Sequence, residues 1–342
     1  MRREANSIHS TINGRAVANP SALPPDTLKA LTRSLKSRWK RYGKQLRKCQ
    51  RKMSERAVHD LRVQARRVLS LLDLLEPFLA AGRLSAARDA LKCQLDTFDD
   101  LRDVQVQLAA VEKLRKGDPE AGDFHRFLRK KETRLQRRTC KHAKRLHNES
   151  LADLIAACRD DAKNWLERST SRQANVILFN ELSRAFGAVT KFQKRIDPNA
   201  PRSIHRTRIA FKKFRYMVEA FAHQLSWVNE RRLENMRRYQ GLMGDIQDAE
   251  VHRKAYQKYG RKEKPDSRLV SRFSNRLLRQ RRRLVARYLA AADLLPQFEP
   301  PSGFLTAKGG KGRNPRGSPA RQTSTGSDRH GSSIGPSKDK TL

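Results

Sequence analysis

The chain carries one pattern of histidine and cationic residues twice, and this internal duplication constrains its fold more than any other feature. HDLRVQARR begins at His59, and HRTRIAFKK begins at His205. When the two histidines are aligned, the cationic positions coincide: Arg62 with Arg208, Arg66 with Lys212, and Arg67 with Lys213. Self-similarity of this kind indicates two copies of one supersecondary unit.

An acidic pattern follows each copy at nearly the same separation. DDLRDVQV contains Asp100 and Asp103, and GDIQDAEV contains Asp245 and Asp248. His59 and Asp103 are 44 residues apart, and His205 and Asp248 are 43 apart. Because two patterns recur in the same order at matched spacing, we expect the body of the chain to consist of two similar helical halves.

Apolar residues recur with helical spacing from Asp26 to about Leu295, so the sequence predicts an all-α fold. Helices are expected in the first half at 26–52, 55–76, 84–115 and 120–147, and in the second half at 173–195, 201–224, 229–258 and 266–294. A further helix at about 150–167 would bridge the halves, which run from about 26 to 147 and from 173 to 294. Residues 1–25 form a polar arm, and the tail 296–342, rich in Gly, Ser, Pro and basic residues, is typical of disordered segments.

The charge balance indicates a polyanionic partner. Lys and Arg total 75 against 35 Asp and Glu, which gives a formal net charge of +40. A compact body with this excess repels itself, and a bound polyanion relieves that repulsion. The charge argues against a small neutral substrate, but it does not by itself choose between nucleic acid, anionic lipid and polyphosphate.

The duplicated cations lie on one face of each predicted helix. His59, Arg62 and Arg66 are spaced i, i+3, i+7, and His205, Arg208 and Lys212 repeat that spacing. The Arg guanidinium suits phosphate because its planar fork donates two parallel hydrogen bonds. A merely solvated face would not need the same histidine and offsets in both copies, so we interpret these ladders as anion contacts.

Two other predicted helices carry cationic stripes. Arg134 and Arg138 belong to one on the fourth helix, and Arg272, Arg276 and Arg279 belong to one on the last helix. Like charges at this spacing cost a few tenths of a kcal/mol per pair. These residues are therefore candidates for additional phosphate contacts, although a solvated face explains them equally well.

The aspartate pairs, Asp100 with Asp103 and Asp245 with Asp248, allow three interpretations. They could bind a metal, act as general acid and base, or form interhelical salt bridges that support the arginines. No further acidic or histidine ligands occur at matched spacing, so we favour supporting salt bridges and predict no resident metal or cofactor. A metal that bridges bound phosphate stays open.

The four cysteines are widely spaced, which is typical of thiols in a reducing compartment. The N-terminal segment lacks the apolar core of a signal peptide, and no run approaches about 20 apolar residues. We therefore expect a cytoplasmic protein that does not cross a membrane.

These patterns resemble those of the CHAD family, the conserved histidine α-helical domain. VHDLRVQARRVLSLLDLLEPFL is similar to its first-half motif and IHRTRIAFKKFRYMVEAF to its second-half motif. LMGDIQDAEV resembles the second-half acidic motif closely, whereas FDDLRDVQV is a looser match because Asp99 replaces the usual glycine. The resemblance spans about 26–295.

The resemblance implies two pseudo-symmetric four-helix bundles with a basic central channel or groove. It also implies non-catalytic binding of inorganic polyphosphate and, in bacteria, association with polyphosphate granules. The positions that match the family's phosphate contacts are His59, Arg62, Arg66, Arg67, His205, Arg208, Lys212, Lys213 and Arg215. The ExExK strand of the triphosphate-hydrolase domain that often accompanies this family is absent, so no enzyme activity is expected.

Non-specific nucleic-acid binding is the main alternative, because it needs only a positive surface. The chain lacks zinc-finger spacing, a basic-zipper pattern and an aromatic RNA-binding strand. A histidine phosphotransfer module is less favoured, because Val63 and Ile209 stand where such modules need a small residue. A metal-dependent phosphohydrolase built on His59-Asp60 is disfavoured because the second copy has Arg206 in place of the aspartate.

Overall fold

The computed structural model describes residues 23–115, 119–264 and 267–301, and all of these belong to one compact unit. The described residues form α-helices, short 3₁₀ helices and connecting turns, and none of them forms a strand. The predicted all-α fold is thus confirmed. The remainder of the predicted N-terminal arm (1–22) and of the tail (302–342) lies outside the described residues.

The helices follow the predicted order. The first half comprises α1 (Thr27–Arg51), α2 (Glu55–Leu75), η1 (Glu76–Phe78), α3 (Ala81–Asp96), α4 (Asp99–Arg115) and α5 (Pro119–Lys144). Next comes α6 (Glu149–Glu167), at the position predicted for the bridging helix. The second half comprises α7 (Ser171–Gln193), α8 (Pro201–Phe221), α9 (Glu230–Glu263), α10 (Ser267–Ala290) and η2 (Ala292–Phe298).

One predicted helix is divided. Residues 84–115 form α3 and α4 rather than a single helix, with a tight turn at Thr97 and Phe98. There the Phe98 N–H donates to the Leu95 carbonyl at 3.0 Å, a three-residue step, while the Phe98 ring is buried. Asp99 and Asp100 then occupy the first turn of α4, where negative charge is favourable near the helix N-terminus. In the second half α9 continues without a break through the matching position.

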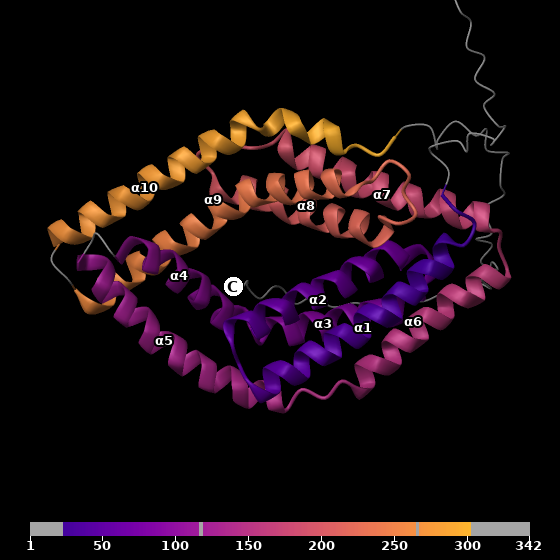
Figure 1. Cartoon of the computed structure of the whole chain (residues 1–342), viewed down its shortest axis with the longest axis horizontal. Helices are drawn as coiled ribbons and strands as arrows, with labels where there is room; N and C mark the ends of the chain where they lie inside the picture. Colours follow the sequence, from indigo (N-terminus) through magenta and orange to yellow (C-terminus); the bar gives the residue numbers. More distant parts are fainter. Residues whose placement is uncertain (1–22, 116–118, 265–266, 302–342) are drawn as a thin grey trace, which may run out of the picture. The chain divides into compact units, whose positions relative to one another are not determined.

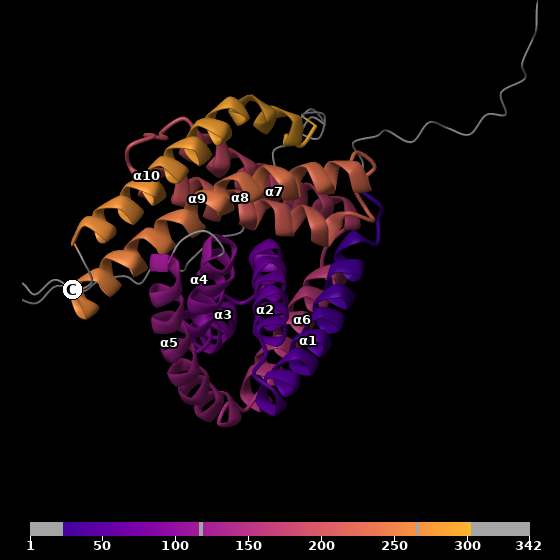
Figure 2. The same cartoon turned by 60° about the vertical axis from the view of Figure 1, so that its left-hand side comes forward.

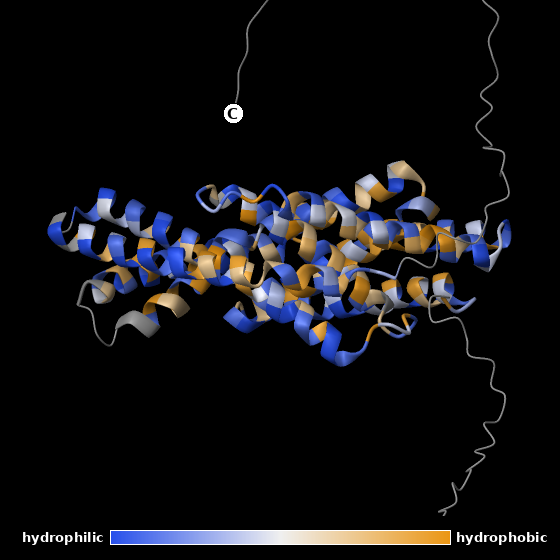
Figure 3. Ribbon diagram, turned by 90° about the horizontal axis from the view of Figure 1, so that it is seen from above, coloured by the Kyte–Doolittle hydropathy of each residue, from blue (hydrophilic) through white to orange (hydrophobic). Residues whose placement is uncertain are grey.

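The helices pack in pairs that follow the duplication. α1 packs on α2 and α7 on α8, while α4 packs on α5 and α9 on α10. α6 lies against α1 and α3, as Figure 1 shows. This order fits two halves of like construction. Figure 3 shows hydrophobic residues (orange) interleaved with hydrophilic residues (blue) along the helices, as expected when each helix buries one side.

Aromatic side chains join the two halves. The Phe124 ring of α5 packs edge-on against Tyr256 of α9 at 5.1 Å, and Tyr256 contacts Phe273 of α10 at 4.4 Å. All three rings are almost fully buried. Aromatic contacts of this kind contribute beyond the area they bury, so they help to fix α5 against the second half.

The packed body extends slightly beyond the predicted limits of 26–295. At its start, Leu23 is buried and its carbonyl accepts a hydrogen bond from Asn175 at 2.9 Å. At its end, Phe298 is buried and contacts Phe211 of α8 at 5.7 Å and Tyr239 of α9 at 5.6 Å. Pro296 therefore lies inside η2 rather than at the end of the packed chain.

Candidate anion-binding site

The two histidine-and-cation ladders lie next to each other. Helix α2 carries the first ladder, α8 carries the second, and the two helices are in contact (Figure 2). Lys212 of α8 lies close to arginines of both helices. Burial, together with the positive charges of Arg66, Arg208 and Arg62, lowers the pKa of Lys212 to about 6. Cations that are far apart in the sequence therefore form one crowded cluster.

In the first half, Arg62 already has an anionic partner. Its side chain is buried with 7% exposure, forms an ion pair with Asp99, and donates to the Leu95 carbonyl at 3.4 Å. Arg66, one helical turn further along, is half-buried. Burial lowers the pKa of Arg66, and the positive charges of Arg208 and Arg102 lower it further.

In the second half, Arg208 lies close enough to Asp248 of α9 for their charges to interact, but the two do not form a direct ion pair. No ion pair joins it to an acid within the described part of the chain, and its Nε atom is buried there without a hydrogen bond. The guanidinium lies over Gly244 of α9, where an added Cβ would stand 3.9 Å from Nε. Glycine thus places no side chain against this arginine, whereas the first half has Asp99 beside Arg62.

The two histidines lie close to these cations. Burial lowers the pKa of each histidine. The positive charge of Arg102 lowers the pKa of His59 further, and that of Arg208 does the same at His205, where a side-chain hydrogen bond with Gln247 raises the pKa. Both imidazoles are therefore mainly neutral at neutral pH, when each can donate one hydrogen bond. A polyanion would raise both pKa values and favour the charged form.

Two predicted contacts are held in internal ion pairs. Lys213 pairs with Asp73 of α2 at 3.0 Å. Arg215 is buried, forms an ion pair with Glu219, and donates to the Gln240 side chain at 2.8 Å. These two cations therefore serve packing between helices in the unliganded structure. Arg67 is half-buried and lies near Arg38 of α1, whose pKa is lowered by burial and then by the charge of Arg67.

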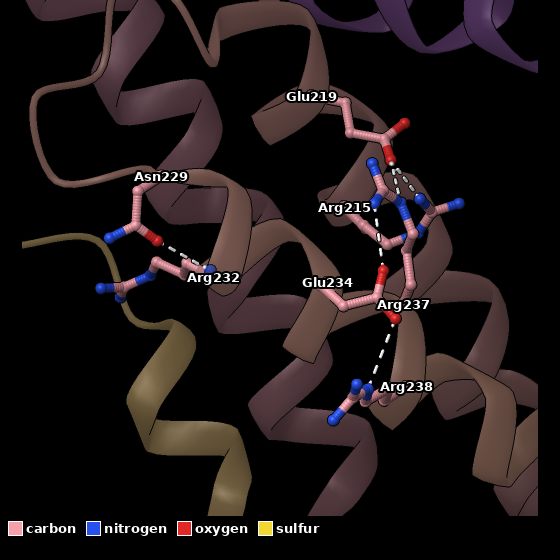
Figure 4. A network of polar contacts seen from close by, with 7 residues as sticks. All are labelled: Arg215, Glu219, Asn229, Arg232, Glu234, Arg237 and Arg238. Atoms are coloured by element: carbon pink, nitrogen blue, oxygen red, sulfur yellow. Dashed lines mark hydrogen bonds and ion pairs between the residues drawn. The ribbon is translucent and has the colours of Figure 1, made fainter.

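Figure 4 shows the ion pairs around Arg215 in detail. The Glu219 carboxylate forms an ion pair with Arg215 on the same helix, α8, and also lies 3.6 Å from the Arg237 side chain of α9. Arg237 also contacts Glu234 at 3.2 Å, and Glu234 lies 3.4 Å from Arg238. The network ties α8 to α9 and fixes the end of the second ladder.

The aspartate pairs adopt different roles. Asp100 forms a salt bridge to the exposed Arg138 of α5 at 2.6 Å rather than to a ladder arginine. Asp103 and Asp248 lie near the cluster: burial raises both pKa values, which Arg62 and Arg208 respectively oppose. Asp245 instead lines a separate pocket between α9, α10 and η2. Across the described ranges, no three His, Cys, Asp or Glu side chains are grouped to hold a metal ion.

The cationic stripes also separate. Arg134 and Arg138 are exposed on α5, and Lys131 on the same helix lies close enough to Asp100 and Asp103 to feel their charges. Arg272, Arg276 and Arg279 are exposed on α10, which packs mainly on α9 and η2. Figure 1 places α10 on the far side of α8 and α9 from α2. The α10 stripe is therefore not part of the cluster.

The structure adds a cation that the ladders did not predict. Arg102 of α4 pairs with Glu55 at 2.9 Å, and its charge lowers the pKa values of His59 and Arg66. It lies between Asp100 and Asp103 in the acidic pattern, so its position in that motif was the available signal. We use the name α2–α8 cluster for the group formed by His59, Arg62, Arg66, Arg102, His205, Arg208 and Lys212.

A match between the chain and a protein-family model assigns the family. A family model described as CHAD domain matches residues 37–257, which is more than half of the chain. The chain belongs to the CHAD family.

Solved CHAD-like structures share the fold. The chain is similar to the crystal structure of the CHAD domain from the plant Ricinus communis, with a TM-score of 0.56, 17% identity, and coverage of 88% of this chain and 98% of that one. It is also similar to PptA from Streptomyces chartreusis, with a TM-score of 0.56, 16% identity, and coverage of 81% and 100% respectively. Comparison with curated proteins finds no match. Of the helices described, none has the length and apolar character needed to span a bilayer.

Proposed function

We propose that this CHAD protein binds inorganic polyphosphate at the α2–α8 cluster without changing it chemically. The observation that carries the proposal is the crowding of cations from both halves around Lys212, where burial together with the charges of Arg66 and Arg208 lowers the pKa of this amine to about 6. Crowded cations are costly in the free protein and become favourable once an anion lies among them. Arg66 and Arg208 supply the forked donors that phosphate oxygens accept.

The cluster suits a bare phosphate chain better than a nucleic acid. Sequence-tolerant binding of single strands relies on exposed aromatic rings on which bases stack. Within the described ranges, the exposed large hydrophobic residues are all aliphatic, namely Val176, Ile209, Leu289 and Leu294. Tyr216, which lies beside the cluster, is buried, and Arg215 covers its ring at 4.4 Å. A polyphosphate chain requires no stacking surface.

The proposal assigns each part of the cluster a role. Arg208 and Lys212 contact phosphate oxygens from α8, Arg66 contacts them from α2, and the two histidines donate at the margins. Lys213 and Arg215 hold the helices in place through their ion pairs. Binding without catalysis in the cytoplasm, including association with polyphosphate granules, is the corresponding cellular role.

Competition binding tests the proposal. Labelled long-chain polyphosphate is bound to the full chain, and unlabelled polyphosphate, duplex DNA or RNA is added as competitor at matched phosphate concentration and physiological salt. We expect polyphosphate to compete far more strongly than either nucleic acid. Equal or better competition by DNA or RNA would overturn the proposal in favour of general nucleic-acid binding.

Two variants with the same change in charge locate the site. The triple variant R66Q/R208Q/K212Q removes three cations from the cluster, and R272Q/R276Q/R279Q removes three from the exposed stripe on α10. Because each lost charge-assisted contact costs about 1.5–3 kcal/mol, the cluster variant should bind at least roughly 100-fold more weakly. The α10 variant should lose only a few-fold. The opposite ranking would place the ligand on α10.

A further inference from the structure

The two half-sites differ at one matched position. Aligning DDLRD with GDIQD places Asp99 at the start of α4 opposite Gly244 in α9. Each residue lies beside the ladder arginine of its own half: Asp99 forms an ion pair with Arg62, and Gly244 lies under Arg208. The first half therefore adds a direct ion pair at this arginine position that the second half lacks, while each arginine also feels one matched aspartate, Asp103 or Asp248.

The ion-paired arginine is the more enclosed one. Only 7% of Arg62 is exposed, whereas Arg208 is half-buried and has no ion pair within the described residues. The Asp99 side chain is 50% exposed, although its Oδ1 atom, which contacts Arg62, is buried. A phosphate approaching Arg62 would meet the Asp99 carboxylate first and be repelled by it.

We propose that Asp99 is a built-in competitor for the anion, so that the two half-sites bind with unequal strength. The second half, through Arg208 and Lys212, provides the primary contact. The first half engages through Arg66, and Arg62 contributes only when the Asp99 carboxylate is displaced. This inference rests on the proposed function and assigns Asp99 as a residue that limits affinity for phosphate chains.

The structure has room for an aspartate at position 244, which would give the second half the same acidic residue that Asp99 provides in the first half. Gly244 lies within α9, and a Cβ added there would meet only the Arg208 Nε atom, at an ordinary contact distance of 3.9 Å. Aspartate at position 244 can therefore be accommodated, and its carboxylate would lie beside Arg208. Asparagine at the same position has nearly the same shape and no charge, which separates the effect of charge from that of bulk.

The test measures polyphosphate affinity for the wild type, D99N, G244D and G244N in the full chain. D99N should bind about 5- to 10-fold more tightly, because one charge-assisted contact becomes available. G244D should bind about 10-fold more weakly than G244N. D100N removes the same charge next to Asp99, but its partner is the exposed Arg138 of α5, so its affinity should change less than twofold.

Thermal unfolding without ligand gives a second readout. D99N removes the direct ion-pair partner of the buried Arg62 and leaves only the more remote charges of Asp103 and Asp96, so it should unfold at a lower temperature than the wild type although it binds more tightly. G244D should show the reverse combination, higher stability and weaker binding. Tighter binding with lower stability distinguishes an internal competitor from a residue that merely positions Arg62, whose loss would weaken both.

The outcomes separate this inference from the proposed function. If the wild type binds polyphosphate but D99N binds equally or more weakly, the inference is overturned and the function stands. If the wild type does not bind polyphosphate, the function fails, and inorganic sulfate then serves as the probe. A larger sulfate-dependent rise in unfolding temperature for D99N than for the wild type would still support competition at Arg62, whereas equal rises would overturn it.

Discussion

Replacing Lys212 with methionine should stabilise the unliganded protein while weakening its binding to polyphosphate. Burial and the neighbouring arginines lower the pKa of Lys212 from 10.5 to about 6, so the folded chain holds this amine mostly neutral at pH 7.5. The unfolded chain would protonate it. Methionine retains the length and apolar stem of the side chain but has no group to desolvate.

The size of the effect follows from proton linkage. The pKa in the folded state lies below that in the unfolded state, so the penalty is complete below pH 6 and disappears as the pH rises toward 10.5. At about 1.4 kcal/mol per pH unit, the penalty at pH 7.5 is at most about 4 kcal/mol. Salt screens the neighbouring charges, so we expect K212M to raise the free energy of unfolding by about 2–4 kcal/mol.

Urea unfolding at several pH values checks this prediction. The stability difference between K212M and the wild type should shrink between pH 7 and pH 9, because the unfolded chain holds one more proton than the folded chain in this range and wild-type stability therefore rises with pH. The neighbouring variant K213M is the control. It loses the 3.0 Å ion pair to Asp73 and should be destabilised by up to about 1 kcal/mol, with little dependence on pH in this range.

Two results would refute the reasoning. If K212M were no more stable than the wild type at pH 7.5, Lys212 would not lie in a costly cationic environment. If the difference in stability were the same at pH 7 and pH 9, it would arise from packing rather than from the charge on the amine.

Two further predictions follow from the same structure. Polyphosphate binding near pH 7.5 should take up protons, because the ligand raises the lowered pKa of Lys212. Titration calorimetry in buffers of different ionisation enthalpy should detect this uptake in the wild type and less of it in K212M. For the same reason, the affinity for polyphosphate should fall as the pH rises above about 6. F298A should destabilise the fold by about 3 kcal/mol, because the buried ring contacts Phe211 and Tyr239, whereas Q297A at the exposed neighbour should have little effect in the same unfolding assay.

The fold was largely predictable from the sequence because helical periodicity is a local signal. The breaks at prolines and the recurrence of apolar residues placed most helices within a few residues of their observed limits. The division of 84–115 was missed because neither Pro nor Gly marks it. A buried Phe98 and two aspartates that favour a helix N-terminus produce the turn, and only the packing of Phe98 shows that the chain bends there.

The candidate site was predictable in its residue types but only partly in its roles. The ladders on α2 and α8 indicated which cations to examine, yet the same motif also contains Lys213 and Arg215, which pair with Asp73 and Glu219. Spacing along a helix assigns a residue to a face. It does not reveal which side chain of another helix meets that face.

The sequence by itself determined that this chain is helical, duplicated and strongly cationic, because periodicity, repetition and net charge depend only on the order and type of the residues. Only the tertiary structure decided that the two ladders adjoin, that α10 lies apart from them, and that Arg62 has a direct ion pair with Asp99 while Arg208 has no side chain at the matched position 244. The reason is that electrostatic interactions depend on distance and burial in three dimensions. Asp99 and Gly244 acquire their opposite effects from the arginine that each one meets.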